Sequence, residues 1–253
     1  MRWWNDYNNA PPMKVPLITI SIVSHKQAEL ASLLLRDIAR LGRDDLQIIY
    51  TMNVPEPLPA EAGDWPITVV RNASSHGFAR NHNAAFRAAP ADYFCVLNPD
   101  IRIHDDPFPA LLSIFDEPRV GVASPSIVDG NGRAEDHARR FPTLRSLAAK
   151  LVRADLDLDY EERGQPFSPD WIAGMFMLFR GSAFQEVGGF DERYFLYYED
   201  IDICRRLRRS GYDIRVTPSA RTTHNARRES RHNVKYMLSH ARSMLRYFTT
   251  RYS

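Results

Sequence analysis

The sequence predicts an α/β protein whose mainly parallel, Rossmann-like sheet is flanked by helices. Apolar, β-branched runs such as Ile18–Val23 alternate with segments whose apolar residues recur every three or four positions. Strands that alternate with helices along a chain form parallel sheets with helices on both faces. These two observations together predict the fold class.

Most of the predicted sheet lies in the first 118 residues. We expect strands at 15–25, 45–53, 65–72 and 92–100, and helices at 27–42, 77–90 and 107–117. In sheets of this kind, ligands bind outside the carboxyl ends of the strands. Ser24, His25, Asn53, Asn72 and Asp100 fall at such ends, so they are candidates for a binding site.

After residue 119 the pattern becomes less regular. The expected elements are a strand from 120 that leads into a glycine-rich turn, a mixed stretch at 139–170, a strand and helix start at 171–184, and a helix within 194–212 that ends at Gly211. A strand broken by Pro218 follows and leaves His224 on a loop. We see no repeat and no clear linker, so residues 15–253 are expected to form one domain behind a tail at 1–14.

Composition excludes several classes of protein. An apolar fraction of 44% and a charged fraction of 25% are typical of a folded globular chain. No apolar run approaches the roughly 20 residues of a transmembrane helix, and the first fourteen residues lack the apolar core of a secretion signal. We therefore expect a cytoplasmic protein.

Positive charge gathers at the C-terminal end. Residues 204–253 contain twelve arginines and one lysine against two acids, although the net charge of the whole chain is only +2. This excess fits either an anionic partner or a solvated arginine-rich surface. The segment 232–248 predicts an amphipathic helix, which either packs on the domain's own core or contacts an anionic surface on the inner face of the membrane.

Two groups of polar residues are candidates for chemistry. Glu199, Asp200 and Asp202 follow five aromatic or apolar residues and open a predicted helix. Acids stabilise a helix N-terminus electrostatically, but apolar surroundings also raise a carboxylate's pKa and suit it to act as a base. His224 is either a solvated side chain or, in company with Asp100, a ligand.

The order of these motifs resembles the family 2 glycosyltransferases, and more narrowly their rhamnosyltransferase-like branch. Four stretches carry the resemblance, at 18–26, 76–103, 171–180 and 187–224. Members of this family are inverting enzymes with the GT-A fold that use nucleotide sugars. The resemblance implies a nucleotide-sugar half at 15–118 and an acceptor and catalytic half at 119–253.

The resemblance also implies roles for individual residues. The family's metal-binding Asp-x-Asp position is here Asn98-Pro99-Asp100, so Asp100 would hold Mg²⁺ or Mn²⁺, with His224 as a further ligand or diphosphate contact. Asp200 would be the catalytic base beside Glu199. The implied nucleotide-sugar contacts are Ser24, His25, Asn53, Gly77, Arg80, Asn81 and Asn98, and the implied acceptor contacts are Trp171 and Gly174.

Two strand ends depart from the family's pattern. Ser24-His25-Lys26 stands where the family usually has Thr-Tyr-Asn, and Thr51-Met52-Asn53 stands where it has an Asp-Asn pair. The nucleobase therefore stays open between a dTDP- and a UDP-sugar, the acceptor is expected to be a glycan or lipid-linked saccharide, and an inactive family member is an alternative.

Two other functions were weighed. A sugar-nucleotide pyrophosphorylase would need a glycine-rich loop after the first strand, and residues 19–30 contain no glycine. A nucleic-acid binder could use the basic C-terminal end, but it has no need for the acids at 199–202, so no nucleic acid is expected.

Overall fold

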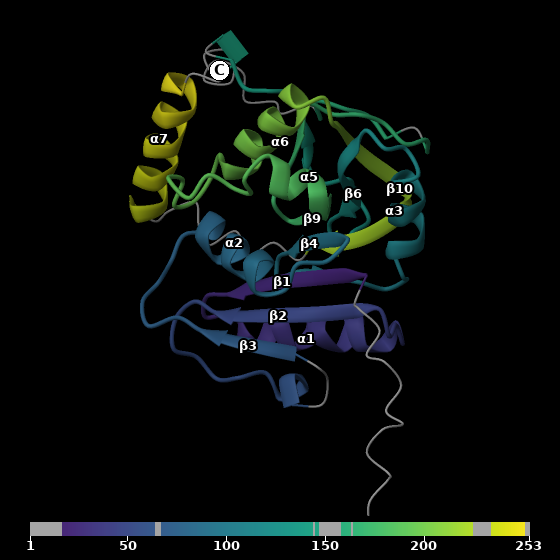
Figure 1. Cartoon of the computed structure of the whole chain (residues 1–253), viewed down its shortest axis with the longest axis vertical. Helices are drawn as coiled ribbons and strands as arrows, with labels where there is room; N and C mark the ends of the chain where they lie inside the picture. The colour runs from purple at the N-terminus through teal and green to yellow at the C-terminus, as the bar shows by residue number, and fades with distance from the viewer. Residues whose placement is uncertain are drawn as a thin grey trace, which may run out of the picture.

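A mixed sheet of eight strands runs through the described part of the chain (Figure 1). The computed structural model describes residues 17–63, 67–143, 145–146, 158–162, 164–224 and 234–250, and the tail predicted at 1–14 lies outside them. In spatial order the strands are β3 (Ile67–Arg71), β2 (Leu46–Met52), β1 (Ile18–Ser24), β4 (Tyr93–Leu97), β9 (Phe176–Arg180), β6 (Val120–Val128), β10 (Asp213–His224) and β5 (Ile101–Arg102). A separate two-stranded sheet pairs β7 (Ala138–Arg139) with β8 (Trp171–Ile172).

The large sheet is mainly parallel, as the sequence predicts. Strand β1 pairs in parallel with β2 and β4, β2 pairs in parallel with β3, and β6 pairs in parallel with β10. The exceptions are β9, which is antiparallel to β4 and β6, and β5, which is antiparallel to β10. The carboxyl ends of β1 to β4 therefore lie along one edge.

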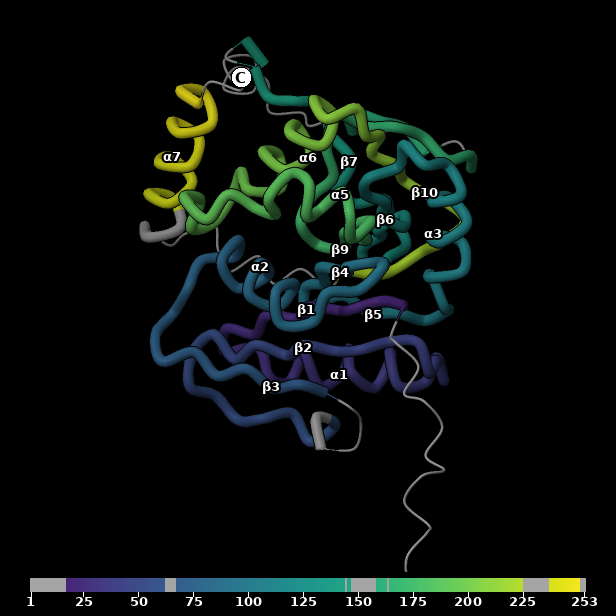
Figure 2. The backbone as a smooth tube through the Cα atoms, in the orientation of Figure 1, coloured from purple at the N-terminus to yellow at the C-terminus, as the bar shows by residue number. Residues whose placement is uncertain are grey.

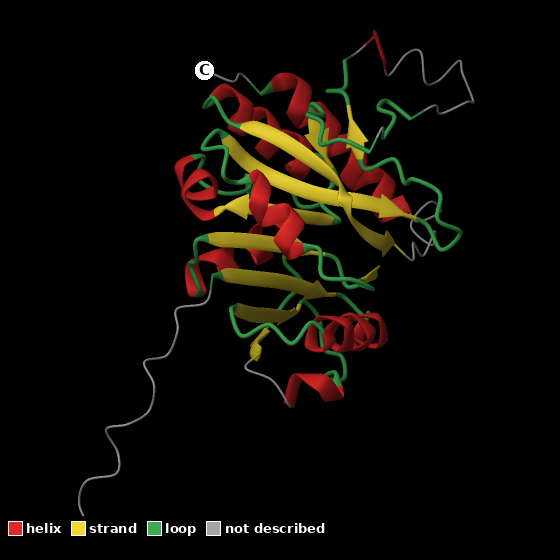
Figure 3. Cartoon of the chain, turned by 90° about the vertical axis from the view of Figure 1, so that its right-hand side faces the viewer, coloured by secondary structure: helices red, strands yellow, loops and turns green. Residues whose placement is uncertain are grey.

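Helices cover both faces of this sheet (Figure 3). They are α1 (Ala28–Arg40), α2 (Phe78–Ala88), α3 (Phe108–Ile114), α5 (Gly181–Glu186), α6 (Glu199–Arg209) and α7 (Val234–Thr249), with a short 3₁₀ turn η1 (Ala60–Gly63). Successive side chains of β4 point to opposite faces, so Cys95 and Leu97 join the core under α1 and α3, whereas Phe94 and Val96 join the core under α2, α5 and α6. Each face of the sheet thus has its own apolar core.

Two local predictions were wrong. The strand expected from Trp171 is two strands in different sheets, because Ala173–Met175 interrupts it. His224 lies in a strand and not on a loop, since β10 continues past Pro218 through a register shift between Thr217 and Arg221. Such an irregularity accommodates a proline, which has no N–H for the strand ladder.

Helix α6 begins at Glu199, as the sequence predicts, because Tyr197 and Tyr198 both have φ of 70°, which is left-handed backbone. The mixed stretch expected at 139–170 lies partly outside the described residues.

Helix α7 lies beside α6 and the segment that leads into it (Figure 2). Ser243 and Tyr247 are buried against that segment, whereas Met237, Leu238 and Leu245 are more than half exposed. The apolar face that the sequence predicts is therefore divided. Part of the helix packs on the core, as one of the two alternatives expected, and part faces outward. No helix of the described ranges has the length and apolar character needed to span a membrane.

Candidate active site

Asp100 and His224 meet at the end of the sheet. His224 is the last residue of β10 and lies opposite Ile101 of β5, which places the preceding residue, Asp100, beside the imidazole. The Nε2 atom of His224 is 3.3 Å from Oδ2 of Asp100, and its Nδ1 atom is 3.8 Å from Oε1 of Glu135. The two side chains of the pair are only 14% and 12% exposed. Two residues 124 positions apart in the sequence thus form one close pair.

Asp37 of α1 anchors the segment that follows Asp100. Its carboxylate accepts hydrogen bonds from Nε of Arg102 at 2.5 Å and from the backbone N–H of Ile103 at 3.1 Å. Burial alone would raise the pKa of Asp37, but the hydrogen bonds from Arg102 and Ile103 lower it below its usual value, so the group is ionised. This buried ion pair fixes β5 and hence the position of Asp100.

The pair has the donor chemistry of a divalent-metal site. Oδ1 of Asp100 is buried and has no hydrogen-bond partner among the described residues, so one carboxylate oxygen is left to bind a ligand. A carboxylate oxygen suits Mg²⁺ and Mn²⁺, and an imidazole nitrogen suits Mn²⁺ better. Within the described ranges, no group of three or more His, Cys, Asp or Glu side chains could hold a metal. Diphosphate and water oxygens would have to complete the shell.

Glu135 and Asp100 also control the charge of His224. Burial lowers the pKa of His224, but the hydrogen bond and charge of Asp100 and the charge of Glu135 outweigh it, so the pKa lies above its usual value. A carboxylate facing the second ring nitrogen is the usual way to fix which nitrogen is free to bind a metal. Sequence reasoning missed Glu135, because this residue follows a glycine turn without any periodic pattern.

The acids at the start of α6 are differently surrounded. Asp200 accepts hydrogen bonds from the N–H groups of Gly174 at 3.1 Å and of Ile201 at 2.9 Å, whereas Oε2 of the buried Glu199 has no partner among the described residues. Burial and the neighbouring charge of Asp200 raise the pKa of Glu199 well above its usual value. Burial also raises the pKa of Asp200, but its two N–H donors oppose this. The pKa of Asp200 is raised less than that of Glu199, so Glu199 is the member of the pair that holds a proton more strongly.

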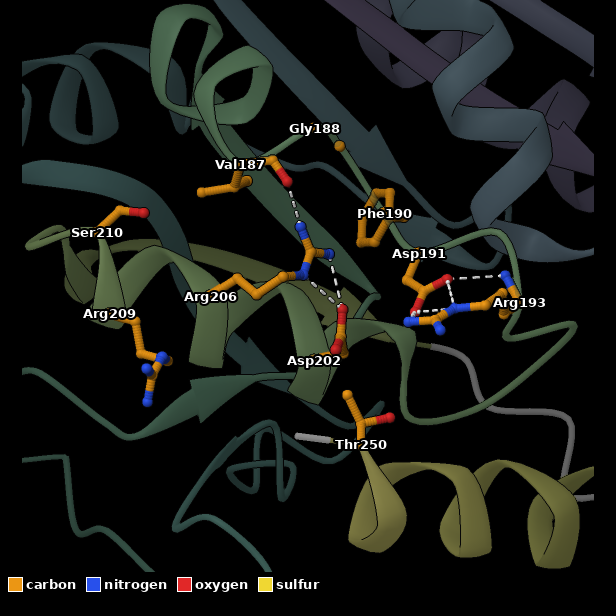
Figure 4. A pocket seen from close by; sticks show the side chains of 11 residues that line it. Val187, Gly188, Phe190, Asp191, Arg193, Asp202, Arg206, Arg209, Ser210 and Thr250 are labelled. Atoms are coloured by element: carbon orange, nitrogen blue, oxygen red, sulfur yellow. Dashed lines mark hydrogen bonds and ion pairs between the residues drawn. The ribbon is translucent and has the colours of Figure 1, made fainter. Parts of the chain in front are cut away.

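Asp202 has a separate, structural role. Its carboxylate forms an ion pair of 2.7 Å with Arg206, one turn later in α6, and Arg206 also donates to the carbonyl of Val187 (Figure 4). The sequence allowed two roles for the acids at 199–202, stabilisation of the helix and action as a desolvated base, and the structure divides these roles between different residues. Asp202 supports the helix, while Glu199 and Asp200 form the desolvated pair.

A strained turn positions this pair. Tyr197 and Tyr198 occupy left-handed backbone, which costs a non-glycine residue roughly 1–2 kcal/mol. Helix α7 holds the turn, because Ser243 donates a 2.8 Å hydrogen bond to the carbonyl of Leu196 and the His240 ring lies 5.3 Å from both tyrosine rings. The direction of the Glu199 and Asp200 side chains thus depends on α7.

The segment Ala173–Met175 connects the two groups of acids. Its Gly174 amide binds Asp200, and the carbonyl of Met175 accepts a 2.9 Å hydrogen bond from the N–H of Asn98. Asn98 lies two residues before Asp100. Asp200 and the Asp100–His224 pair are therefore attached to opposite ends of one short strap.

Several residues expected to contact the nucleotide sugar lie at or near the ends of β1 and β2. The side chain of Asn53 is engaged with the protein: its amide donates to the carbonyl of His76 at 3.0 Å and accepts from Asn72 at 2.9 Å. Asn81 accepts a 2.8 Å hydrogen bond from the same Asn72. This network holds the loop before α2, so a direct nucleotide contact by Asn53 or Asn81 stays a prediction.

Gly77 has a structural explanation within the chain. A Cβ atom at this position would lie 2.5 Å from the carbonyl oxygen of Phe195. The backbone that approaches Gly77 is thus that of Phe195. Arg80, in the first turn of α2, is exposed, and its guanidinium makes no hydrogen bond or ion pair with the described residues, so it remains free to pair with phosphate.

The remaining candidates differ in accessibility. Ser24 is fully buried, whereas His25 is exposed. Trp171 is only 7% exposed, and its indole N–H donates to the carbonyl of Arg140 at 2.9 Å. A Cβ atom on Gly174 would lie 3.0 Å from the ring of Phe78. Trp171 thus supports the two-stranded sheet from within, and its contact with an acceptor stays a prediction.

Two cavities lie near the start of α6, and neither is lined by Asp100, Asp200 or His224. The smaller, of about 430 Å³, lies between Val187–Asp191, α6 and Thr250, and two of its three arginines, Arg193 and Arg206, are paired with Asp191 and Asp202 (Figure 4). The larger, of about 1430 Å³, lies between α7, the segment Arg193–Leu196 and the end of β1.

Comparison with known proteins gives relatives in both sequence and structure. Over 167 residues the chain is 30% identical to rhamnosyltransferase WbbL of Escherichia coli (strain K12), covering 62% of this chain and 63% of that protein. Over 173 residues it is 34% identical to the N-acetylglucosaminyl-diphospho-decaprenol L-rhamnosyltransferase of Mycobacterium tuberculosis (strain ATCC 25618 / H37Rv), covering 64% and 56%. The chain thus spans about three fifths of the length of these relatives.

The fold also resembles solved structures. The mannosyltransferase PcManGT from Pyrobaculum calidifontis, solved in complex with GDP-Man and Mn²⁺, superimposes with a TM-score of 0.65 at 18% identity, covering 96% of this chain and 66% of that one. GalNAc-T7, solved with UDP, GalNAc and Mn²⁺, gives a TM-score of 0.63 at 15% identity, covering 88% and 45%. This likeness confirms the expected GT-A fold.

The family model described as "Glycosyltransferase like family 2" matches residues 41–244. That range is well over half of the 253 residues and includes Asp100, Asp200 and His224. The chain therefore belongs to glycosyltransferase family 2.

Proposed function

We propose that this protein is an inverting, metal-dependent glycosyltransferase that moves a sugar from a nucleoside diphosphate to a hydroxyl of a glycan or lipid-linked saccharide. Rhamnose is the favoured sugar, because both sequence relatives named above are rhamnosyltransferases. The lipid-linked acceptor is favoured by the name of the mycobacterial relative. A dTDP- or UDP-sugar as donor, a role in surface polysaccharide synthesis and a cytoplasmic location stay predictions.

The environment of Asp200 is the observation that carries this proposal. An acceptor hydroxyl is a weak nucleophile, and it needs a base that is ionised, fixed in place and within hydrogen-bond reach. Asp200 is fixed by two backbone N–H donors and lies beside a carboxyl group that holds its own proton, so it provides such a base.

In the proposed reaction, Asp200 accepts the proton of the acceptor hydroxyl. The hydroxyl oxygen then forms a bond to the anomeric carbon while the bond from that carbon to the diphosphate oxygen breaks, so the configuration inverts. Arg80 pairs with the departing diphosphate, which needs its negative charge neutralised. A Mg²⁺ or Mn²⁺ ion held by Asp100 and His224 would supply further positive charge to the diphosphate.

The first experiment is a screen of the purified protein with dTDP-rhamnose and with UDP- and GDP-sugars. We expect one donor to raise Tm, with a larger shift when Mn²⁺ or Mg²⁺ is present, and to be consumed when a saccharide acceptor is added. Binding of a donor without transfer or hydrolysis for any acceptor would favour the inactive family member instead.

A further inference from the structure

The larger cavity forms a groove along α7 that the proposed reaction does not use. It is lined on one side by residues of α7 and on the other by His25, Lys26 and Ser75 near the carboxyl ends of β1 and β3. Its floor includes Phe195 and Leu196, directly before the strained turn of Tyr197 and Tyr198. In Figure 1, α7 lies at the side of the molecule toward which β2 and β3 point.

The charge of this groove is entirely positive. The lining residues include Lys26, Arg193, Arg242 and Arg246, and none of them is an aspartate or glutamate. Arg193 is paired with Asp191. The side chains of Lys26, Arg242 and Arg246 make no ion pair or hydrogen bond with the residues that the structure describes. Three cations are thus available to one anionic ligand.

The same groove exposes apolar side chains. Phe195 is 56% exposed, Leu238 54% and Leu245 66%, and all three line it. Met237 of α7 is 62% exposed as well. Across the described residues, the only other exposed large hydrophobic side chains are Leu58 and Leu158, and each of these is only 41% exposed. Exposed apolar area concentrated at one place marks a binding surface.

We infer that this groove binds the phosphate-bearing lipid end of the acceptor, with its phosphate groups on Arg242, Arg246 and Lys26 and the start of its apolar chain along Phe195, Leu238 and Leu245. Positive charge alone would suit any anion, and apolar area alone would suit any hydrophobic chain. Their combination in one groove fits a molecule that carries both. The inference rests on the proposed function for the identity of this ligand as the acceptor.

The floor of the groove connects lipid binding to the catalytic pair. Ser243 of α7 donates to the carbonyl of Leu196, and Leu196 precedes the turn that aims Glu199 and Asp200. A lipid in the groove would lie against both sides of this contact. The saccharide at its head would then extend toward the strap that carries Asp200.

Direct binding tests the inference without turnover. The probe is farnesyl diphosphate, titrated into the full-length protein by calorimetry with UDP or dTDP present at saturation to occupy the donor site. Inorganic diphosphate, which has no apolar chain, and farnesol, which has no phosphate, are the matched probes. We expect farnesyl diphosphate to bind at least tenfold more tightly than either.

Variants then locate the site. Arg242→Glu with Arg246→Glu should weaken farnesyl diphosphate binding at least tenfold, and so should Leu238→Ser with Leu245→Ser. These side chains are at the surface of α7, so the variants should keep the far-UV spectrum and Tm of the parent. Arg209→Glu, in the smaller cavity, is the control and should bind as the parent does.

Two results would overturn the inference. One is that both double variants bind farnesyl diphosphate with unchanged affinity. The other is that Arg242→Glu with Arg246→Glu reduces sedimentation with phosphatidylglycerol vesicles while farnesyl diphosphate binding is unchanged, which would make the face a site for an anionic bilayer. These tests measure binding and not sugar transfer. Failure of the proposed catalytic function would therefore leave this binding site intact, and failure of the binding site would leave the proposed catalytic function intact.

Discussion

The backbone N–H of Gly174 lies 3.1 Å from the carboxylate of Asp200, and this hydrogen bond ties the start of α6 to the loop between β8 and β9. The next residue, Met175, accepts a hydrogen bond from Asn98 at the end of β4. The proposed base and the proposed metal ligand Asp100 are therefore held by neighbouring residues. A change in the 173–175 segment would disturb both.

Asp200→Asn should abolish transfer while leaving donor binding intact. The amide keeps the shape of the carboxylate but cannot accept the acceptor's proton, so we expect turnover to fall roughly 10²–10⁴-fold. Initial rates and calorimetric titration of the donor measure the two effects. Glu199→Gln is the matched control, because an amide replaces a carboxyl group that is already neutral and turnover should stay within a fewfold of the parent. Equal losses of turnover in the two variants would show that Asp200 and Glu199 do not have different catalytic roles.

Asp100→Ala should lose the metal-dependent part of nucleotide affinity. Without the carboxylate, a divalent ion would keep only His224 as a protein ligand. Titrations of the nucleoside diphosphate with Mn²⁺ and with EDTA should therefore give the same affinity in this variant and different affinities in the parent. If the parent itself binds equally well in EDTA, neither Asp100 nor His224 holds a metal.

Gly77→Ala should destabilise the fold and slow turnover. The new Cβ would lie 2.5 Å from the carbonyl oxygen of Phe195, and the Phe195 backbone would have to shift, at a cost of roughly 1–3 kcal/mol. Because Phe195 precedes the turn into Glu199, the shift should also lower the rate. Gly132→Ala is the control for turnover: nothing lies within 4 Å of its Cβ, and its left-handed backbone should cost roughly 1–2 kcal/mol of stability without a steric clash. Urea unfolding and initial rates of both variants check this, and an unaffected Gly77→Ala enzyme would contradict it.

His82 should make stability fall as the pH is lowered. It is buried against Phe78, its Nδ1 lies 2.8 Å from the hydroxyl of Ser21, and burial lowers its pKa to about 3. Between pH 6.5 and 3 the unfolded chain binds a proton that the folded chain does not, so the free energy of unfolding rises with pH in this window. When the pH is lowered from 7 to 5, His82 should reduce the free energy of unfolding by about 2 kcal/mol.

The matching variant is His82→Gln, which is neutral at every pH. His137 is also buried with a lowered pKa and acts in the same direction, so the quantity to compare is the pH-dependent loss in the parent minus that in the variant. Urea unfolding at pH 7 and pH 5 supplies it. A difference near zero would show that His82 binds its proton equally well in the folded and the unfolded chain.

The sequence was sufficient to predict most of the fold, because strands such as β1 and β4 are short apolar runs and α1 has strong helical spacing. It was not sufficient where tertiary contacts override local pattern. The break at Ala173–Met175 follows from hydrogen bonds to Asp200, Asn98 and His137, which lie far away in the sequence. Likewise, β10 passes Pro218 because its partner β6 supplies a shifted register.

The candidate site shows the same division. The pairing of Asp100 with His224 was suggested by family resemblance, and the structure brings the two side chains together. Asp37 could have been noticed, since it is a charged residue on the apolar side of α1 between Leu34 and Ile38. Glu135 could not, because nothing in its neighbourhood distinguishes it from a surface acid.

Because Tyr197 and Tyr198 occupy left-handed backbone, the geometry of the proposed catalytic pair depends on helix α7, although α7 supplies none of the proposed catalytic residues. This strained backbone persists only while the hydrogen bond from Ser243 and the ring contacts of His240 hold the turn in place. A protein shortened before Val234 would retain every side chain proposed for catalysis, yet its turn would be free to relax and point Glu199 and Asp200 elsewhere. The shape of the loop at Tyr197 and Tyr198 thus depends on His240 and Ser243, which lie 42 and 45 residues after Tyr198 in the sequence.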